Sequence, residues 1–207
     1  EFFMFKGGFE IKGEFSSTNI KIIASLHVFD HYHAYYNLLE DYLLYIKEIK
    51  KIKEIIDHLN SDYLKIRYLH DLLITTNEYN NEALAAVPTN ENALAHSPIS
   101  ALLDKYNPVC EGYAELFNIL LNYANINNFI AVGNILSGTA HAWNYVQINN
   151  KWYEIDLTFD DPIYGHQHFY NRVNYKYFLT PRDESREITA SEVNQVIIDS
   201  INSAKEY

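Results

Sequence analysis

Three residues of this sequence have the side-chain types needed for chemistry on an acyl group: Cys110, His141 and Asp156. Cys110 is the sole cysteine, and it begins an apolar stripe at helical spacing in the stretch NPVCEGYAELFNILLNYA. A cysteine in the first turn of a helix lies near unpaired backbone N–H groups and the positive end of the helix dipole, which favour the thiolate. The backbone N–H of Cys110 is also placed to donate to an oxyanion that forms beside the sulfur.

His141 and Asp156 occupy two aromatic-rich runs that flank an Asn-Asn pair after Ile148. Because asparagine tolerates positive φ, this pair predicts a two-residue hairpin turn that sets Ile148 opposite Lys151. Pairing continued outward sets His141 opposite Thr158 and makes His141 and Asp156 diagonal neighbours on one face, within reach of a hydrogen bond. A three-residue loop would place them on opposite faces. With the two-residue turn, the carboxylate orients the imidazole and leaves its second nitrogen free to transfer a proton.

Each of these residues also has a purely structural interpretation. A lone cysteine is often a small buried hydrophobic residue, and a His–Asp pair on a hairpin is often a structural ion pair. A metal-site hypothesis rests on two pairs of alternate histidines, His31 with His33 and His166 with His168. No cysteine cluster or HExxH motif completes a ligand set around them, so we expect no metal site and no cofactor.

Composition and charge narrow the function classes. The formal net charge of −11 argues against a nucleic-acid-binding surface, which needs a basic face. Residues 116–150 contain no Lys, Arg, Asp or Glu, but asparagines interrupt each apolar run well short of the ~20 residues of a membrane span. We expect this charge-free segment to be the buried centre of the domain.

The hydrophobic patterns predict an α+β domain in which helices come first and antiparallel strands follow. Helices are expected at 30–58, at 62–75 behind a Ser61 or Asp62 cap, at 107–123 and at 188–204. Short strands are expected within 2–29, and further strands at 129–135, 140–148 and 152–159. The segment 80–108 is expected to be irregular.

At these residues the chain resembles the transglutaminase-like superfamily, papain-like thiol enzymes with the chain order Cys, His, Asp, and in particular its bacterial members. The matching motifs are VCEGYAELF at 109–117, HAWNYV at 141–146 and WYEIDLTFDDP at 152–162. Further likenesses lie at 68–80, 95–110 and 177–184, so the resemblance covers about 62–185. It divides the chain into an N-terminal extension of short strands and a long helix, residues 1–60, and a catalytic core, residues 61–207.

The resemblance implies a papain-like fold, in which the helix that carries Cys110 packs on an antiparallel sheet that carries His141 and Asp156. Cys110 would be the nucleophile, His141 the general base and then the acid, and Asp156 the orienting carboxylate. Animal transglutaminases have an upstream tryptophan that helps to bind the oxyanion, and this chain has none there. We expect Tyr79 to be the second oxyanion donor beside the Cys110 N–H, with a packing role for Tyr79 as the alternative.

The implied activity is thiol-dependent acyl transfer on a protein or peptide amide, with an amine acceptor giving transamidation and water giving deamidation or peptide hydrolysis. The enzyme would be a protein-glutamine transamidase or a cysteine peptidase, and many relatives of this type are secreted or attached to the cell surface. Trp143, Tyr145 and Trp152 are candidates for lining the acyl-binding cleft, although aromatic residues in strands usually pack. The alternative is a catalytically quiet binding or scaffold module that keeps the fold.

Overall fold

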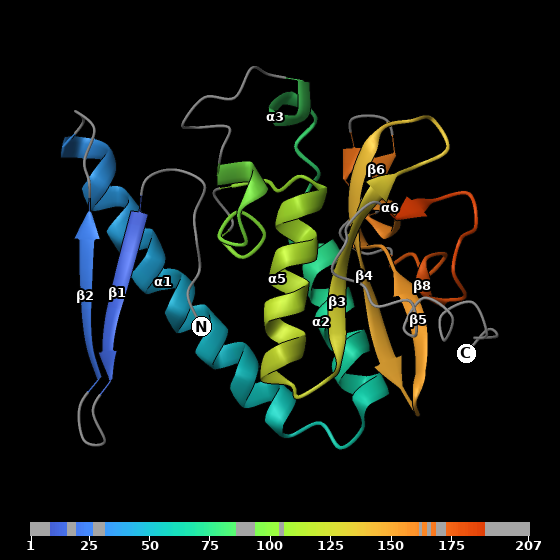
Figure 1. Ribbon diagram of the computed structural model, residues 1–207, viewed down its shortest axis with the longest axis horizontal. Coiled ribbons are helices and arrows are strands. Elements are labelled where there is room, and N and C mark those ends of the chain that lie inside the picture. Colours follow the sequence, from blue (N-terminus) through green and yellow to red (C-terminus); the bar gives the residue numbers. More distant parts are fainter. Residues whose placement is uncertain are drawn as a thin grey trace. The chain divides into compact units, whose positions relative to one another are not determined.

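The computed structural model of the chain (Figure 1) describes residues 9–15, 20–26, 32–85, 94–103, 106–161, 163–164, 167–168 and 173–188. The chain forms two compact units, residues 1–44 and 45–207. In the smaller unit, β1 (Phe9–Phe15) and β2 (Ile20–Leu26) pair in antiparallel fashion. Helix α1 (Tyr32–Asp57) begins in the smaller unit and ends in the larger one. The short strands predicted within 2–29 and the helix predicted at 30–58 are confirmed, and the division at residue 60 stays a prediction.

The remaining helices belong to the larger unit. They are α2 (Asp62–Thr76), α3 (Asn81–Ala85), the 3-10 turn η1 (Leu94–His96), α5 (Cys110–Tyr123) and α6 (Leu157–Asp160). Ser61 is the cap of α2, because its Oγ accepts a hydrogen bond from the Leu64 N–H at 3.2 Å. None of the described helices is both long enough and apolar enough to cross a membrane.

The main sheet of the larger unit is antiparallel throughout, with the strand order β8-β5-β4-β3-β9. Its strands are β3 (Asn128–Asn134), β4 (Ala140–Ile148), β5 (Lys151–Ile155), β8 (Phe178–Thr180) and β9 (Glu187–Ile188). The predicted two-residue turn joins β4 and β5: Asn149 and Asn150 have φ of 52° and 62°, and Ile148 lies opposite Lys151. Two short strands, β6 (Ile163–Tyr164) and β7 (Gln167–His168), pair separately.

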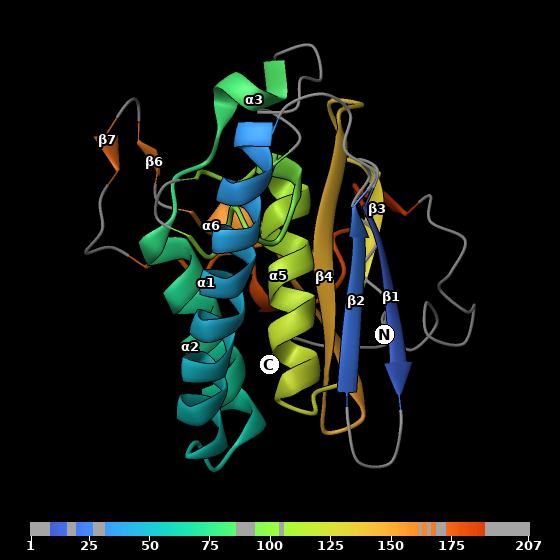
Figure 2. The ribbon, with the colours of Figure 1, turned by 90° about the vertical axis from the view of Figure 1, so that its left-hand side faces the viewer.

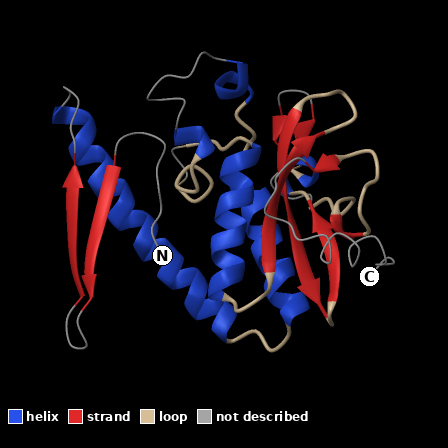
Figure 3. Ribbon diagram, viewed as in Figure 1, coloured by secondary structure: helices blue, strands red, loops and turns tan. Residues whose placement is uncertain are grey.

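Helix α5 lies between the sheet and α2, as the side view in Figure 2 shows. Its apolar stripe is buried, and Phe117, Leu120 and Leu121 have no exposed surface. On the sheet side, Nδ2 of Asn144 in β4 donates to the Ala114 carbonyl at 3.0 Å and ties the strand to the helix. Within the larger unit, Figure 3 shows α2 and α5 on one side of the antiparallel sheet. The α+β class, with a Cys-bearing helix on an antiparallel sheet, is therefore confirmed.

The strand predicted at 152–159 is too long. Strand β5 ends at Ile155, and α6 begins two residues later. The reason is a helix cap: Oδ1 of Asp156 accepts a hydrogen bond from the Phe159 N–H at 3.1 Å. The helix predicted at 188–204 lies outside the described residues, apart from its first residue, which belongs to β9.

Candidate functional site

Cys110 is the first residue of α5, and its side chain is partly exposed. The preceding loop packs closely on this end of the helix, where the Val109 N–H donates to the Ala95 carbonyl at 2.9 Å. A Cβ at Gly112 would lie 2.8 Å from the same carbonyl, so glycine is needed for this close approach. The loop thus holds the thiol at a helix N-terminus, where unpaired N–H groups and the dipole favour negative charge.

His141, near the start of β4, is bonded to Asp156: Nε2 lies 2.8 Å from Oδ2. Both side chains are buried, with 6% of His141 and 0% of Asp156 exposed. Two aromatic rings stack on the imidazole, Phe159 at a centroid distance of 4.7 Å and Trp143 at 5.9 Å. The carboxylate and the two rings together fix the plane of the imidazole.

This contact forms although the strand ladder does not extend as far as we predicted. Pairing between β4 and β5 ends with Asn144 opposite Ile155, and Thr158, which we expected opposite His141, lies in α6. Asp156 directly follows the last paired residue. As the cap of α6 it uses Oδ1 for the helix and presents Oδ2 to the imidazole.

The Cys110 side chain forms a hydrogen bond with His141. Because the bond to Asp156 uses Nε2, Nδ1 is the nitrogen available to the thiol. Burial by itself lowers the pKa of His141, but hydrogen bonds with Asp156 and Cys110, and the charges of both groups, raise it to about 9. At neutral pH His141 is therefore an imidazolium that bridges the carboxylate and the sulfur.

Tyr79, in the loop between α2 and α3, contacts the same cysteine. Its hydroxyl accepts a hydrogen bond from the Cys110 backbone N–H and forms another with the Cys110 side chain. Burial and the charge of Cys110 raise the pKa of Tyr79 to about 12, so the hydroxyl keeps its proton at neutral pH. The ring also packs on a buried cluster of Ala83, Ala95 and Val109. The two groups expected as oxyanion donors therefore lie next to each other at the sulfur.

A fourth group, Arg186, was missed by the sequence analysis and is only 3% exposed. Its Nη1 donates to Asp156 Oδ2 at 2.7 Å, and it lies 3.0 Å from Glu154 Oε1 as an ion pair without hydrogen-bond geometry. Arg186 stands in the polar stretch RDESREI, which has the composition of an exposed turn. No local signal in that stretch points to a buried arginine.

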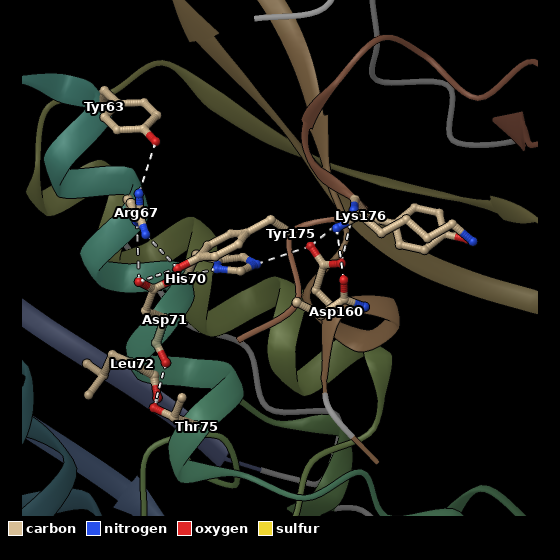
Figure 4. Close-up of polar contacts among 11 residues, drawn as sticks. Tyr63, Arg67, His70, Asp71, Leu72, Thr75, Asp160, Tyr175 and Lys176 are labelled. Atoms are coloured by element: carbon tan, nitrogen blue, oxygen red, sulfur yellow. Dashed lines mark hydrogen bonds and ion pairs between the residues drawn. The ribbon is translucent and has the colours of Figure 1, made fainter. Parts of the chain in front are cut away.

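Helix α2 carries a second buried imidazole, His70, in the polar network of Figure 4. Its Nδ1 lies 3.0 Å from Asp71 Oδ1, and its Nε2 lies 3.2 Å from Asp160 Oδ2. Asp160 also accepts from the Tyr177 N–H at 2.9 Å, while the Tyr177 carbonyl accepts from the Asp156 N–H at 3.1 Å. Burial lowers the pKa of His70, but hydrogen bonds with Asp160 and Asp71 raise it above its ordinary value. This network supports the backbone on which Asp156 stands.

The aromatic residues expected to line a cleft are found in the core instead. Trp143, Tyr145 and Trp152 form one buried cluster with Ala131, and each is at most 8% exposed. Tyr145 additionally donates its hydroxyl to Glu154 Oε2 at 2.7 Å. Their burial favours the packing role that was the alternative for these residues, and a contact with substrate stays a prediction.

The two histidine pairs considered for a metal site lie outside the residues whose side chains are described. They are His31 with His33 and His166 with His168. Within the described part of the chain, no group of three or more His, Cys, Asp or Glu side chains is arranged to hold a metal ion.

Comparison with known proteins gives a family match over slightly more than half of the chain. The sequence profile of the Transglutaminase-like superfamily matches residues 50–157. Among solved structures, a TGase is similar with 19% identity and a TM-score of 0.49, over 78% of this chain and 47% of that chain. A proposed cysteine protease from Cytophaga hutchinsonii has 21% identity and a TM-score of 0.42, over 54% of this chain and 37% of that one. The chain thus spans less than half of either structure. No curated protein matches the sequence.

Proposed function

The chain belongs to the transglutaminase-like superfamily, and we propose that it transfers acyl groups from amide substrates through a thioester on Cys110. The observation that carries this proposal is the contact of one imidazole, His141, with both the Cys110 side chain and Asp156. A thiol at a helix N-terminus beside an imidazolium is the arrangement that activates cysteine as a nucleophile. The proposed substrate is a protein or peptide amide, as in transamidases and cysteine proteases.

In the first step, the sulfur of Cys110 bonds to the carbonyl carbon of the amide, and the carbonyl oxygen takes up the negative charge. As the C–N bond breaks, the His141 imidazolium gives its Nδ1 proton to the leaving amine, and a thioester remains. In the second step, an amine or water attacks the thioester and passes a proton to the neutral imidazole. The sulfur leaves as thiolate beside the imidazolium, and the next amide can then be attacked.

The oxyanion of the first step would accept hydrogen bonds from the Cys110 N–H and the Tyr79 hydroxyl. Support for Tyr79 comes from its two contacts with Cys110 and from its hydroxyl, which carries a proton at neutral pH. Tyr79→Phe is therefore expected to lower kcat by roughly 10²–10³-fold, the usual effect of removing one oxyanion donor. The matched control is Tyr106→Phe, a partly buried tyrosine in the segment before Val109. Equal rates for the Tyr79 variant and wild type would assign Tyr79 to packing alone.

The test of the function uses a glutamine-containing peptide together with a primary-amine probe. Wild type and Cys110→Ala are incubated with both, and mass spectrometry distinguishes amine incorporation, deamidation and backbone cleavage. We expect at least one of these products with wild type and none with Cys110→Ala. If wild type yields none of them, and iodoacetamide labels Cys110 no faster than it labels glutathione, the chain is the catalytically quiet module instead.

A further inference from the structure

Asp156 Oδ2 receives two donors, and only one of them is the imidazole. Nε2 of His141 lies 2.8 Å away and Nη1 of Arg186 lies 2.7 Å away, while Oδ1 accepts from the Phe159 N–H at 3.1 Å. Asp156 has no exposed surface and Arg186 is 3% exposed. A buried carboxylate is costly without a paired and hydrogen-bonded cation, and Arg186 is a second such cation beside the His141 imidazolium. We propose that Arg186 is a positioning residue of the catalytic centre, which holds the Asp156 carboxylate in the orientation that His141 requires.

The topology of the sheet explains how a late segment brings Arg186 to this place. Strand β8 lies beside β5 at one edge of the sheet, and β9 lies beside β3 at the other. The connection between them therefore has to pass the strands that lie between these edges. Because Asn144 points toward α5, Trp143 points away from it, and Arg186 contacts that opposite face. Arg186 thus reaches Asp156 from the face of β4 that carries Trp143 and His141.

Gly133 anchors the end of this connection. It lies opposite Ile188 in the β3–β9 pair, and a Cβ there would overlap the carbonyl of Glu187. Glycine at this position therefore allows β9 to dock directly after Arg186. Because β9 pairs with β3 directly after Arg186, the sheet holds the backbone next to the guanidinium in place.

The guanidinium and the imidazole share the same aromatic surroundings. Arg186 lies over the rings of Phe159 at 4.9 Å, Tyr177 at 5.2 Å and Trp143 at 5.3 Å. Phe159 and Trp143 are also the rings that stack on His141. Cation–π contacts of a desolvated arginine restrict its position in addition to the carboxylate. The rings of Phe159 and Trp143 therefore restrict both the Arg186 guanidinium and the His141 imidazole. Both of these groups bond to Asp156 Oδ2.

The direction in which removal of Arg186 changes the proton affinity of the His141–Asp156 pair can be predicted. Among the described residues, the charged or titratable groups around the pair are Cys110 at His141, Tyr79 and Asp160 at Asp156, and Glu154 and Asp183 at Arg186. Loss of a nearby positive charge raises the proton affinity of the His141–Asp156 pair as a whole, wherever the proton resides. The imidazolium then donates its proton less readily, and the carboxylate is free to rotate. Both effects slow acyl transfer.

This inference rests on the proposed function, and its test separates the two. The test variant is Arg186→Met combined with Glu154→Gln, because Glu154 is fully buried and would otherwise lose its counter-ion. Glu154→Gln alone keeps Arg186 beside Asp156 and is the matched reference. For each protein, the rate of iodoacetamide labelling of Cys110 is measured against pH without substrate, and kcat/KM is measured with the peptide.

Relative to the reference, the double variant is expected to have kcat/KM about 10²-fold lower, the effect of a misplaced catalytic group. The alkaline step in its labelling profile, at which His141 loses its proton beside the Cys110 sulfur, is expected to move upward by about one pH unit. Identical rates and labelling profiles for the two proteins would overturn the proposal. If the double variant does not fold, Arg186→Lys, which keeps the charge without the planar fork, carries the test, and a wild-type kcat/KM for it overturns the proposal. A shifted labelling profile in a protein that turns over no peptide would retain the positioning role and reject acyl transfer.

Discussion

The larger unit contains two buried imidazole–carboxylate pairs whose acids bracket the same short helix. His141 binds Asp156, the cap of α6, and His70 binds Asp160, the last residue of α6. Both histidines are at most 6% exposed, and both have a raised pKa because carboxylates outweigh the effect of burial. By residue type and burial, the two pairs are alike.

They differ in what the second ring nitrogen contacts. Both nitrogens of His70 are bonded to carboxylates, Asp71 and Asp160. His141 uses Nε2 for Asp156 and forms a hydrogen bond with the Cys110 side chain. An imidazole held at both ends by acids stabilises the structure, whereas one held at a single end can exchange a proton with a nucleophile. The partner of the second nitrogen, and not the His–Asp pair itself, is therefore what sets the proposed catalytic histidine apart from His70.

The largest difference between the two pairs is expected in the rate of acyl transfer. His141→Gln removes the proton donor and is expected to lower kcat/KM by roughly 10⁴-fold, the upper range for loss of general acid–base catalysis. His70→Gln is expected to lower kcat/KM far less, because His70 acts only through the backbone that carries Asp156 and does not contact the reacting groups. Initial rates with the peptide are compared at a temperature where circular dichroism shows both variants folded. Losses of similar size in both variants would remove the distinction.

The free energy of unfolding is expected to show the reverse order, with a larger loss for His70→Gln than for His141→Gln. His70→Gln leaves Asp160, which has no exposed surface, with the Tyr177 N–H as its partner among the described residues. Breaking a buried pair in this way costs about 3–5 kcal/mol of unfolding free energy. His141→Gln is expected to cost less than about 2 kcal/mol, because Asp156 keeps Arg186 and its helix cap. Urea unfolding of the two variants measures the order, and a larger loss for the His141 variant would contradict it.

The pH dependence separates the two imidazoles further. The His141 imidazolium persists up to a pKa of about 9, so acyl transfer is expected to decline as the pH rises through about 9. His70→Gln should retain this alkaline limit. Asp156→Asn should lower it, because the bond to Asp156 is the largest effect that raises the His141 pKa. If the alkaline limit of acyl transfer shifts in His70→Gln, His70 takes part in the proton transfer.

The unfolding free energy should also fall at alkaline pH. The folded-state pKa of each histidine lies above its ordinary value of 6.5, so each contributes stability that is complete below that pH. This contribution is lost as the pH rises through the folded-state pKa. His70→Gln is expected to flatten the alkaline decline in urea midpoints relative to wild type, and an unchanged slope would exclude His70 as a source of it.

The smallest effect is expected for a third imidazole–carboxylate pair, which is exposed. His96 Nδ1 lies 3.0 Å from Glu111 Oε2, with 44% and 47% of the two side chains exposed. Solvent screens such pairs, so His96→Ala is expected to change the unfolding free energy by at most about 0.5 kcal/mol. A cost above that of His141→Gln would show that burial does not control the strength of these pairs.

Much of the site could be predicted because its parts have local signals. The Asn-Asn pair predicted a two-residue turn with positive φ, and this turn sets the register of β4 and β5. The apolar stripe that starts at Cys110 predicted a helix with the thiol in its first turn. Tyr79 was proposed as an oxyanion donor from its place in the segment NEYN, which precedes α5 in the chain. Its contact with Cys110 could be seen only in the folded chain.

The missed features depend on contacts between residues far apart in the chain. Arg186 is 30 residues from Asp156, and His70 is 90 residues from Asp160. Hydrophobic periodicity and turn patterns do not predict contacts between residues far apart in the chain, because each pattern describes a single helix, strand or turn. The cap at Asp156 was missed for a related reason: one side-chain bond to the Phe159 N–H ends a strand whose apolar alternation continues.

The covalent intermediate is the most direct test of the central claim that Cys110 carries an acyl group with the help of His141 and Asp156. The peptide is mixed with enzyme, quenched in acid, and the intact protein is weighed by mass spectrometry. The account predicts an acyl adduct on wild type that maps to Cys110, is released by hydroxylamine and is absent from Cys110→Ala. Consumption of the peptide without any adduct on Cys110, or an equal adduct on Cys110→Ala, would contradict it.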